Sequence, residues 1–236
     1  GFAWMLGQIP PPTDSDVVAR TERQPLNRSE RWAFLKRHGL AVLLIITAYT
    51  LVTLLRSVRA DFSRELWQAL GSPGAAMVFT QSEMWVTLAV LIPMGLMARI
   101  RDNRRAFYAG LGVSCLGLAM VAAACLAWRR GGIDAFGFMV AVGIGLYLPY
   151  IAVHATLFER FIALTRDRAN LGFLMYLADT AGYLAVCVVM LTRGRLMTAD
   201  GVLPLFLDAG LTIAVLGIGT LVLAGGWMHR GHKQVG

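Results

Sequence analysis

The chain has 236 residues, of which 57% are hydrophobic and 15% are charged, and its mean hydropathy is +0.60. Soluble domains carry about 25% charged residues, so this composition excludes a soluble globular enzyme. A formal charge of +8 would suggest nucleic-acid binding in a soluble protein. Here the apolar runs make membrane topology the first question, because spans of about 20 residues divide this length into roughly six helices and one tail.

The N-terminal region is predicted to lie outside the main membrane bundle. Residues 1–9, GFAWMLGQI, read as the end of a preceding transmembrane helix, so we expect the chain to be part of a longer protein. Residues 10–37 are predicted to form a cytoplasmic linker, rich in proline, and an interfacial helix that begins at a capping box of Asn27 and Glu30. Trp32 and Phe34 interleave with basic residues there, as on a membrane surface. The alternative is that this helix is only the start of the first span.

Six apolar segments then fill residues 38–229, and each is bounded by charges or turn residues. They lack the period-two alternation of barrel strands, so helices are the only spanning structure left. The predicted fold is therefore all-α, an integral membrane bundle with a cytoplasmic tail at residues 230–236 and helices at residues 39–55, 75–98, 106–128, 135–158, 171–192 and 203–228.

The distribution of basic residues predicts the orientation. If the N-terminal tail is cytoplasmic, 15 of the 22 lysines and arginines fall on the cytoplasmic side and 7 on the other. Such a bias is typical of an even number of spans with both termini inside. The sequence thus predicts a multi-pass protein of a cell membrane with both termini cytoplasmic. Its partner is the lipid bilayer, and the net charge needs no nucleic acid.

Two carboxylates lie well inside predicted spans. At 1.5 Å per residue, Glu83 lies ~10 Å from the outer end of its span, and Asp179 lies ~12 Å from the inner, cytoplasmic end of its span. Ionisable groups are costly in lipid, so they normally face a partner or a water-filled cavity. If the two helices are neighbours, both carboxylates would address one cavity near the midplane. The alternative is that each is a protonated group that hydrogen-bonds to another helix.

Polar stripes extend this pattern over four of the six spans. Their members recur at helical spacing on otherwise apolar helices, as expected beside an aqueous pathway. They are Tyr49, Thr53 and Arg56; Thr80, Glu83 and Thr87; Tyr147, Tyr150 and His154; and Gly172, Tyr176, Asp179 and Tyr183. The span at residues 106–128 instead has a run of small residues, which favours close packing against protein.

Several of these residues also have plainer interpretations. His154 lies near the end of its span, where an interfacial position is the simpler reading, and Arg56 is placed for snorkelling. Asp208 is interpreted as a charge at a helix start. Pro149 predicts a kink, which would serve either gating or packing. The cysteines Cys115, Cys125 and Cys187 are interpreted as small core residues, not as disulfide or metal ligands.

The six-span unit resembles the C-terminal half of a major facilitator superfamily transporter. In that superfamily a basic loop with the pattern G-x-x-x-D-R-x-G-R-R joins the second and third helices of each half. Here Gly95 is followed by Arg99, Arg101, Asp102, Arg104 and Arg105, so the aspartate comes three positions late and the motif is degenerate. The resemblance implies that the first and fourth helices line a cavity, the second and fifth gate it, and the third and sixth form the outer scaffold.

The chain is also similar to an uncharacterised bacterial family of membrane proteins, classed as a domain of unknown function. Four stretches carry this likeness: RADFSRELWQALG, RIRDNRRA, GLYLPYIAVHATLFERFIAL and NLGFLMYLADTAGYL. The family has no assigned substrate, so the similarity implies a fold but not an activity.

The leading functional hypothesis is half of a secondary transporter for an unknown small solute, with its substrate bound at the interface with a missing N-terminal six-helix half. Glu83 and Asp179 are the candidates for proton or cation coupling. The polar side chains expected to line the cavity are Tyr150, Tyr176 and His154. The alternative is a non-transporting scaffold or sensor that docks partners on its basic loop. An enzyme is not expected, because no catalytic motif is present, and neither a cofactor nor a metal is expected.

Overall fold

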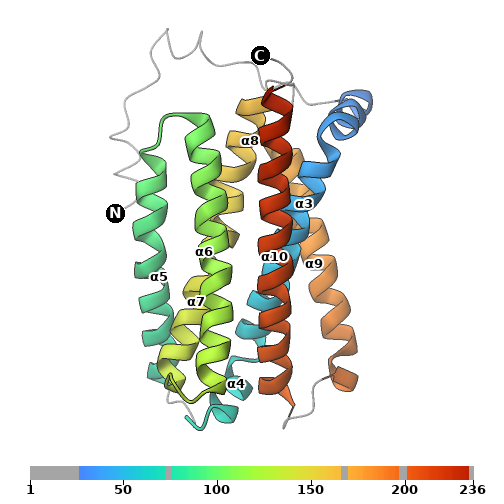
Figure 1. Ribbon diagram of the computed structural model, residues 1–236. Coiled ribbons are helices and arrows are strands. Elements are labelled where there is room, and N and C mark those ends of the chain that lie inside the picture. Colours follow the sequence, from blue (N-terminus) through green and yellow to red (C-terminus); the bar gives the residue numbers. More distant parts are fainter. Residues whose placement is uncertain (1–26, 73–75, 166–169, 197–200, 234–236) are drawn as a thin grey trace, which may run out of the picture.

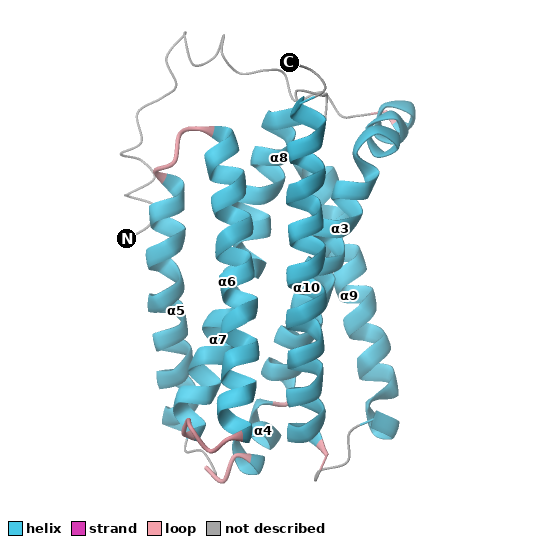
Figure 2. Ribbon diagram, in the orientation of Figure 1, coloured by secondary structure: helices cyan, strands magenta, loops and turns pink. Residues whose placement is uncertain are grey.

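The computed structural model describes residues 27–72, 76–165, 170–196 and 201–233 (Figure 1). These residues form helices joined by short turns and contain no strand (Figure 2). The elements are α3 (Arg28–Asp61), α4 (Ser63–Ala69), α5 (Ala76–Ala98), α6 (Asn103–Arg129), α7 (Ala135–Ala152), the π-helix η1 (Val153–Leu157), α8 (Phe158–Thr165), α9 (Leu171–Leu196) and α10 (Val202–Lys233).

Six helical segments in the described part are long and apolar enough to cross a membrane, which confirms the predicted all-α fold. Five are α3, α5, α6, α9 and α10, and the sixth is the continuous run of α7, η1 and α8. The short helix α4 lies between α3 and α5 at the end of the bundle away from Arg28 (Figure 1). Segments predicted within residues 1–26 and 234–236 lie outside the described residues.

Helix α3 agrees with one of the two interpretations of its first turns. Its capping box forms as expected, because the Asn27 side chain accepts from the Glu30 backbone and the Glu30 side chain accepts from the Asn27 backbone. The helix then continues without a break for 34 residues, so the interfacial helix and the first span are one element. Its early turns are already packed, since Phe34 is buried with its ring edge against Phe161.

The fourth span is irregular where the sequence predicted a kink. Pro149 has no backbone N–H to donate, and the α-helical pattern gives way to the π turn of η1 shortly after it. The π turn contains His154, and the chain then returns to α-helix at Phe158. A π turn re-aims the side chains it carries, so its position affects the polar residues described below.

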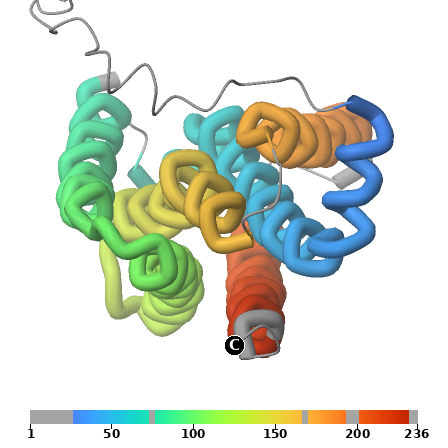
Figure 3. The backbone as a smooth tube through the Cα atoms, turned by 90° about the horizontal axis from the view of Figure 1, so that it is seen from above, coloured from blue at the N-terminus to red at the C-terminus, as the bar shows by residue number. Residues whose placement is uncertain are grey.

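The spans are arranged so that α3 and α7 lie in the middle of the bundle. Helix α5 packs on α7, α9 packs on α3, and α3 and α7 contact each other. Seen along the bundle, α5 and α9 lie on opposite sides, with α3, α7 and α8 between them (Figure 3). Helices α6 and α10 pack on each other, and they cover α7 and α3 on the side of the bundle that faces the viewer in Figure 1.

Helices α5 and α9 are much less covered than the others. Only 17% of the most apolar window of each is buried, against 39% to 56% in the other four spans. Their exposed residues are mostly large and apolar, and include Trp85, Ile92, Leu184 and Leu191. The described helices thus leave one broad side, flanked by α5 and α9, without a protein cover.

The predicted close packing of the third span is found between α6 and α7. A Cβ atom on Gly117 would lie 2.6 Å from the carbonyl oxygen of Gly145, and one on Gly145 would lie 2.6 Å from that of Gly117. The two backbones therefore touch at this crossing, where only glycine fits. This contact fixes α7, which carries residues of both polar clusters described next.

Candidate functional site

Two polar clusters meet helix α3, and they differ in composition. The first, called the Asp179 cluster, contains Tyr49, Arg56, Tyr147, Tyr150, His154 and Asp179. The second, called the Arg59 cluster, contains Arg59, Glu83 and the backbone carbonyl of Met139. Their arginines are three residues apart in the sequence.

Asp179 on α9 is bound from two other helices. Its Oδ1 atom accepts a hydrogen bond of 2.7 Å from the Tyr49 hydroxyl of α3 and lies 3.2 Å from Nε2 of His154 in η1. The Asp179 side chain is 33% exposed and that of His154 is 20% exposed. This carboxylate is therefore held by neutral or titratable groups, with part of its surface still open.

An aromatic stack connects this carboxylate to an arginine. The rings of Tyr49 and Tyr150 are stacked with centroids 5.5 Å apart, and the His154 ring lies 4.9 Å from Tyr49 and 5.3 Å from Tyr150. The Arg56 guanidinium lies 4.3 Å above the centroid of Tyr150 and 5.8 Å from that of Tyr147. Opposite charges thus occupy the two ends of one stack of rings.

Local sequence features explain why these side chains meet. Tyr49 and Arg56 lie two turns apart on one face of α3, and Tyr147 and Tyr150 lie one turn apart on α7. On α9, Gly182 follows Asp179 by one turn. A Cβ atom at Gly182 would lie only 3.2 Å from Thr53 and 3.4 Å from Tyr49, so this glycine lets α9 approach α3.

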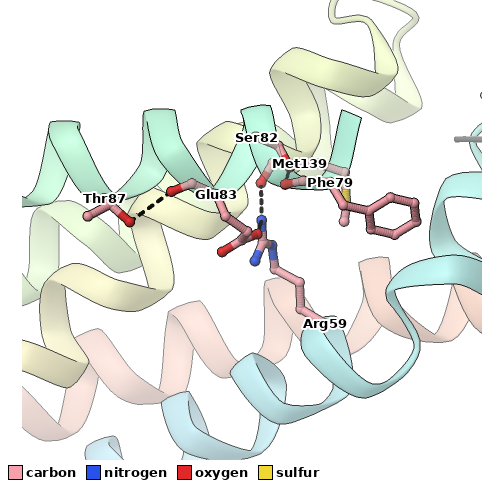
Figure 4. A network of polar contacts seen from close by, with 6 residues as sticks. All are labelled: Arg59, Phe79, Ser82, Glu83, Thr87 and Met139. Carbon is pink, nitrogen blue, oxygen red and sulfur yellow. Dashed lines mark hydrogen bonds and ion pairs between the residues drawn. The ribbon is translucent and has the colours of Figure 1, made fainter. Parts of the chain in front are cut away.

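The Arg59 cluster joins a buried arginine to a carboxylate that is 48% exposed (Figure 4). Arg59 is 4% exposed; its Nη2 lies 2.7 Å from Oε1 of Glu83 on α5 and donates to the Met139 carbonyl of α7 at 3.0 Å. Gly143 of α7 leaves the space for it, since a Cβ atom there would lie 2.8 Å from Nη2. The arginine therefore joins three helices through one charged group.

The condition under which Glu83 and Asp179 would address one cavity, that their helices are neighbours, is not met among the described residues. Their helices are not neighbours, because α5 packs on α7 while α9 packs on α3. Each carboxylate belongs to a different cluster, Glu83 with Arg59 and Asp179 with Tyr49 and His154. Sequence reasoning did not single out Arg59. Its position one turn after Arg56, on the same face of the helix, was the available signal.

Other predicted residues fall in varied places. Tyr150 and His154 belong to the Asp179 cluster, and Nε2 of His154 lies 3.2 Å from Asp179, so His154 is not simply interfacial. Arg56 lies over rings instead of extending to the membrane surface. Tyr176 is 77% exposed on α9, outside the cluster. Asp208, expected only as a helix-start charge, also pairs with Arg129 of α6.

The basic loop between α5 and α6 is exposed. Asp102 has a structural task, because its Oδ1 accepts from the backbone N–H of Arg105 at 2.7 Å and caps α6. Arg104 lies 3.4 Å from Nδ1 of His229 on α10, and Arg99 and Arg101 are exposed. Within the described residues, no three histidine, cysteine or acidic side chains gather in a way that would hold a metal ion.

These features define a polytopic α-helical membrane protein with six apolar helices and, among the described residues, two polar clusters between its helices. A model of DUF5690, described as a family of unknown function, matches residues 1–231, and the chain belongs to this family. The predicted membership of an uncharacterised family is thereby confirmed. No curated protein and no solved structure matches the chain at a significant level.

Proposed function

We propose that this chain is one six-helix half of a secondary transporter for a small solute, and that a second six-helix half covers the side flanked by α5 and α9. The solute would bind between the halves, and rocking of one against the other would give alternating access. By the distribution of basic residues, both termini of this half would be cytoplasmic, in a bacterial inner membrane.

The observation that carries this proposal is the partly exposed Asp179 cluster in the middle of a membrane bundle. A charged side chain at the centre of a bilayer costs about 3 kcal/mol on insertion scales, so such groups face protein or water. Asp179 and His154 remain 33% and 20% exposed after the described helices have packed. A protein partner that leaves a water-filled cavity over the cluster removes this cost.

The order of the helices supports the same proposal. The first and fourth spans, α3 and α7, lie centrally and carry most of the Asp179 cluster. The second and fifth spans flank them, and the third and sixth cover them from one side, the lower edge in Figure 3. This is the arrangement implied by the resemblance to the major facilitator superfamily. The apolar exposed faces of α5 and α9 would then pack against the second half.

Each candidate residue receives a role. The pair of Asp179 and His154 would take up and release the coupling proton, while Tyr150 would contact the solute from the cavity wall. Tyr176, on the exposed face of α9, would contact the solute or the second half. Glu83 remains a second candidate for coupling, although its ion pair with Arg59 favours a part in holding α3, α5 and α7 together. No step of this cycle is enzymatic.

Reconstitution of the full-length protein tests this proposal. Proteoliposomes containing a pH-sensitive dye would be screened with a panel of solutes for proton movement driven by solute. We expect Asp179→Asn to abolish that movement, whereas Asp208→Asn, the same change at a carboxylate outside the cluster, should preserve it. Transport by Asp179→Asn with unchanged pH dependence would remove Asp179 from coupling, and failure of every solute would favour the scaffold or sensor alternative.

A further inference from the structure

Arg56 has an unusual environment for an arginine inside a membrane bundle. Among the described residues its guanidinium contacts two tyrosine rings, and no carboxylate lies within ion-pair distance of it. Arg59, one turn away on the same helix, has both a carboxylate and a carbonyl as partners. An arginine packed against rings between apolar helices without a counter-ion is costly, so its position indicates that an anion is supplied from elsewhere.

We infer that Arg56 binds the anionic group of the solute, and that the solute is a small organic monoanion carrying a carboxylate. This inference rests on the proposed function, because it assigns a substrate class to the same site. The guanidinium forms paired hydrogen bonds with a carboxylate, and a cation already stacked on Tyr150 keeps its edge in a fixed direction. The rings of Tyr147 and Tyr150 suit an apolar body next to that carboxylate.

The charge of the cluster selects a monoanion over a dianion such as phosphate. A dianion needs a second cation, but the next arginine on α3, Arg59, is already bound to Glu83. Asp179 adds a negative charge at the other end of the aromatic stack, which opposes a further negative charge on the solute.

The same charge count predicts how a proton accompanies the anion. With Asp179 ionised and His154 neutral, Arg56 and Asp179 balance each other. A bound monoanion leaves the cavity with one net negative charge, which is unfavourable at low dielectric. Uptake of one proton by the pair of His154 and Asp179 restores neutrality. Transport is then electroneutral, with one proton per anion.

Few other groups could take this proton. Two helices, α3 and α8, pack against α9. Besides the Asp179 cluster, α3 brings Arg31 against α9, with its guanidinium 5.5 Å from the centroid of the Phe173 ring. Other titratable and charged side chains of α3 and α8 are His38, which packs on Phe161 and Trp227, the exposed Glu159, and Arg160, which donates to Asn103. Helix α9 itself adds Tyr176 and Tyr183, both exposed.

Calorimetric titration of the detergent-solubilised full-length protein tests the anion site. The probes share one body and differ in one group: benzoate, benzamide and benzylamine, together with pyruvate, acetate and inorganic phosphate. We expect binding by at least one monocarboxylate and by neither benzamide nor benzylamine. Arg56→Gln should weaken that binding by about ten-fold or more, because it removes the charged donor of the paired hydrogen bonds. Arg56→Lys should restore part of it, and Arg64→Gln, at an exposed arginine of α4, should leave it unchanged.

Titrations in buffers of different ionisation enthalpy measure how many protons the protein takes up when the anion binds. The wild type should take up about one proton per bound anion, and Asp179→Asn should take up none. The inference is overturned if no monocarboxylate binds, if benzylamine or benzamide binds instead, or if Arg56→Gln binds as tightly as the wild type. If the protein binds an amine and the dye assay detects its transport, the anion site is overturned and the transport function stands. If a carboxylate binds through Arg56 but is never transported, the transport function is overturned and the anion site stands.

Discussion

Arg56 and Arg59 lie one turn apart on α3, yet the protein uses them in different ways. Arg59 is almost fully buried and joins α3, α5 and α7 through Glu83 and the Met139 carbonyl. Arg56 lies over Tyr147 and Tyr150 and has no ion pair with the described residues. A charge with its counter-ion in the same bundle holds helices together. A charge without one is available for a ligand.

The carboxylates show the same contrast. Glu83 is matched by an arginine, whereas Asp179 is held by a tyrosine hydroxyl and a histidine. Removing one partner from a matched pair leaves a charge uncompensated, so stability should suffer. Removing a group from the Asp179 cluster leaves the packing largely intact, so function should suffer first. Four variants separate these two kinds of site, from the largest expected effect on stability to the smallest.

Glu83→Gln should give the largest loss of stability. It leaves Arg59 buried among three helices without a counter-ion, and we expect a loss of about 3 kcal/mol in the free energy of unfolding. Unfolding in mixed micelles would measure it. The double variant Arg59→Met, Glu83→Met removes both charges and should recover part of the loss. If Glu83→Gln alone is as stable as the wild type, the Arg59 cluster does not hold the helices together.

Gly117→Ala tests the helix contact that positions parts of both clusters. The added methyl group would lie 2.6 Å from the Gly145 carbonyl oxygen and 2.8 Å from Pro149, so α7 must shift, at a cost of about 1–3 kcal/mol. Gly112→Ala is the matched control on α6, because nothing lies within 4 Å of its added Cβ. That change should be neutral or slightly stabilising, since alanine favours the helix. Equal effects of the two changes would contradict close packing at Gly117.

Arg56→Gln should change the free energy of unfolding by no more than about 1 kcal/mol, the contribution of a cation–π contact. Arg59→Gln, at the neighbouring arginine, should cost several times as much. Parallel thermal melts of the two variants, combined with binding assays, make the comparison direct. If Arg56→Gln were the more destabilising of the two, the assignment of structural and functional arginines would have to be reversed.

Asp208→Asn should have the smallest effect. Its ion pair with Arg129 joins α10 to α6, but the two side chains are 70% and 42% exposed. Exposed ion pairs contribute about 0–1 kcal/mol, so a melting curve close to that of the wild type is expected. A loss comparable to that of Glu83→Gln would show that exposure does not distinguish these ion pairs.

Much of the fold follows from the sequence alone. Apolar runs long enough to span a membrane are a local property, so six helices could be placed before any contact was known. Asn27 and Asp102 cap the starts of α3 and α6, and each of these helices is a candidate span. Of the two interpretations of the residues after Asn27, the structure agrees with the start of the first span, because basic residues do not interrupt a helix whose apolar side chains, such as Phe34, find a packing partner.

The site was predicted only in part, because the partners of a polar side chain come from other helices. The sequence placed Asp179, Tyr150 and His154 on inward stripes, and their polar character in an apolar span was sufficient for that. It could not show that Glu83 and Asp179 belong to separate clusters, or that Arg56 and Arg59 differ. Those outcomes depend on which helices are neighbours and on how each is rotated. Close contacts at Gly143 and Gly182 help to fix which helices are neighbours and how each is rotated, and these contacts exist only in the folded bundle.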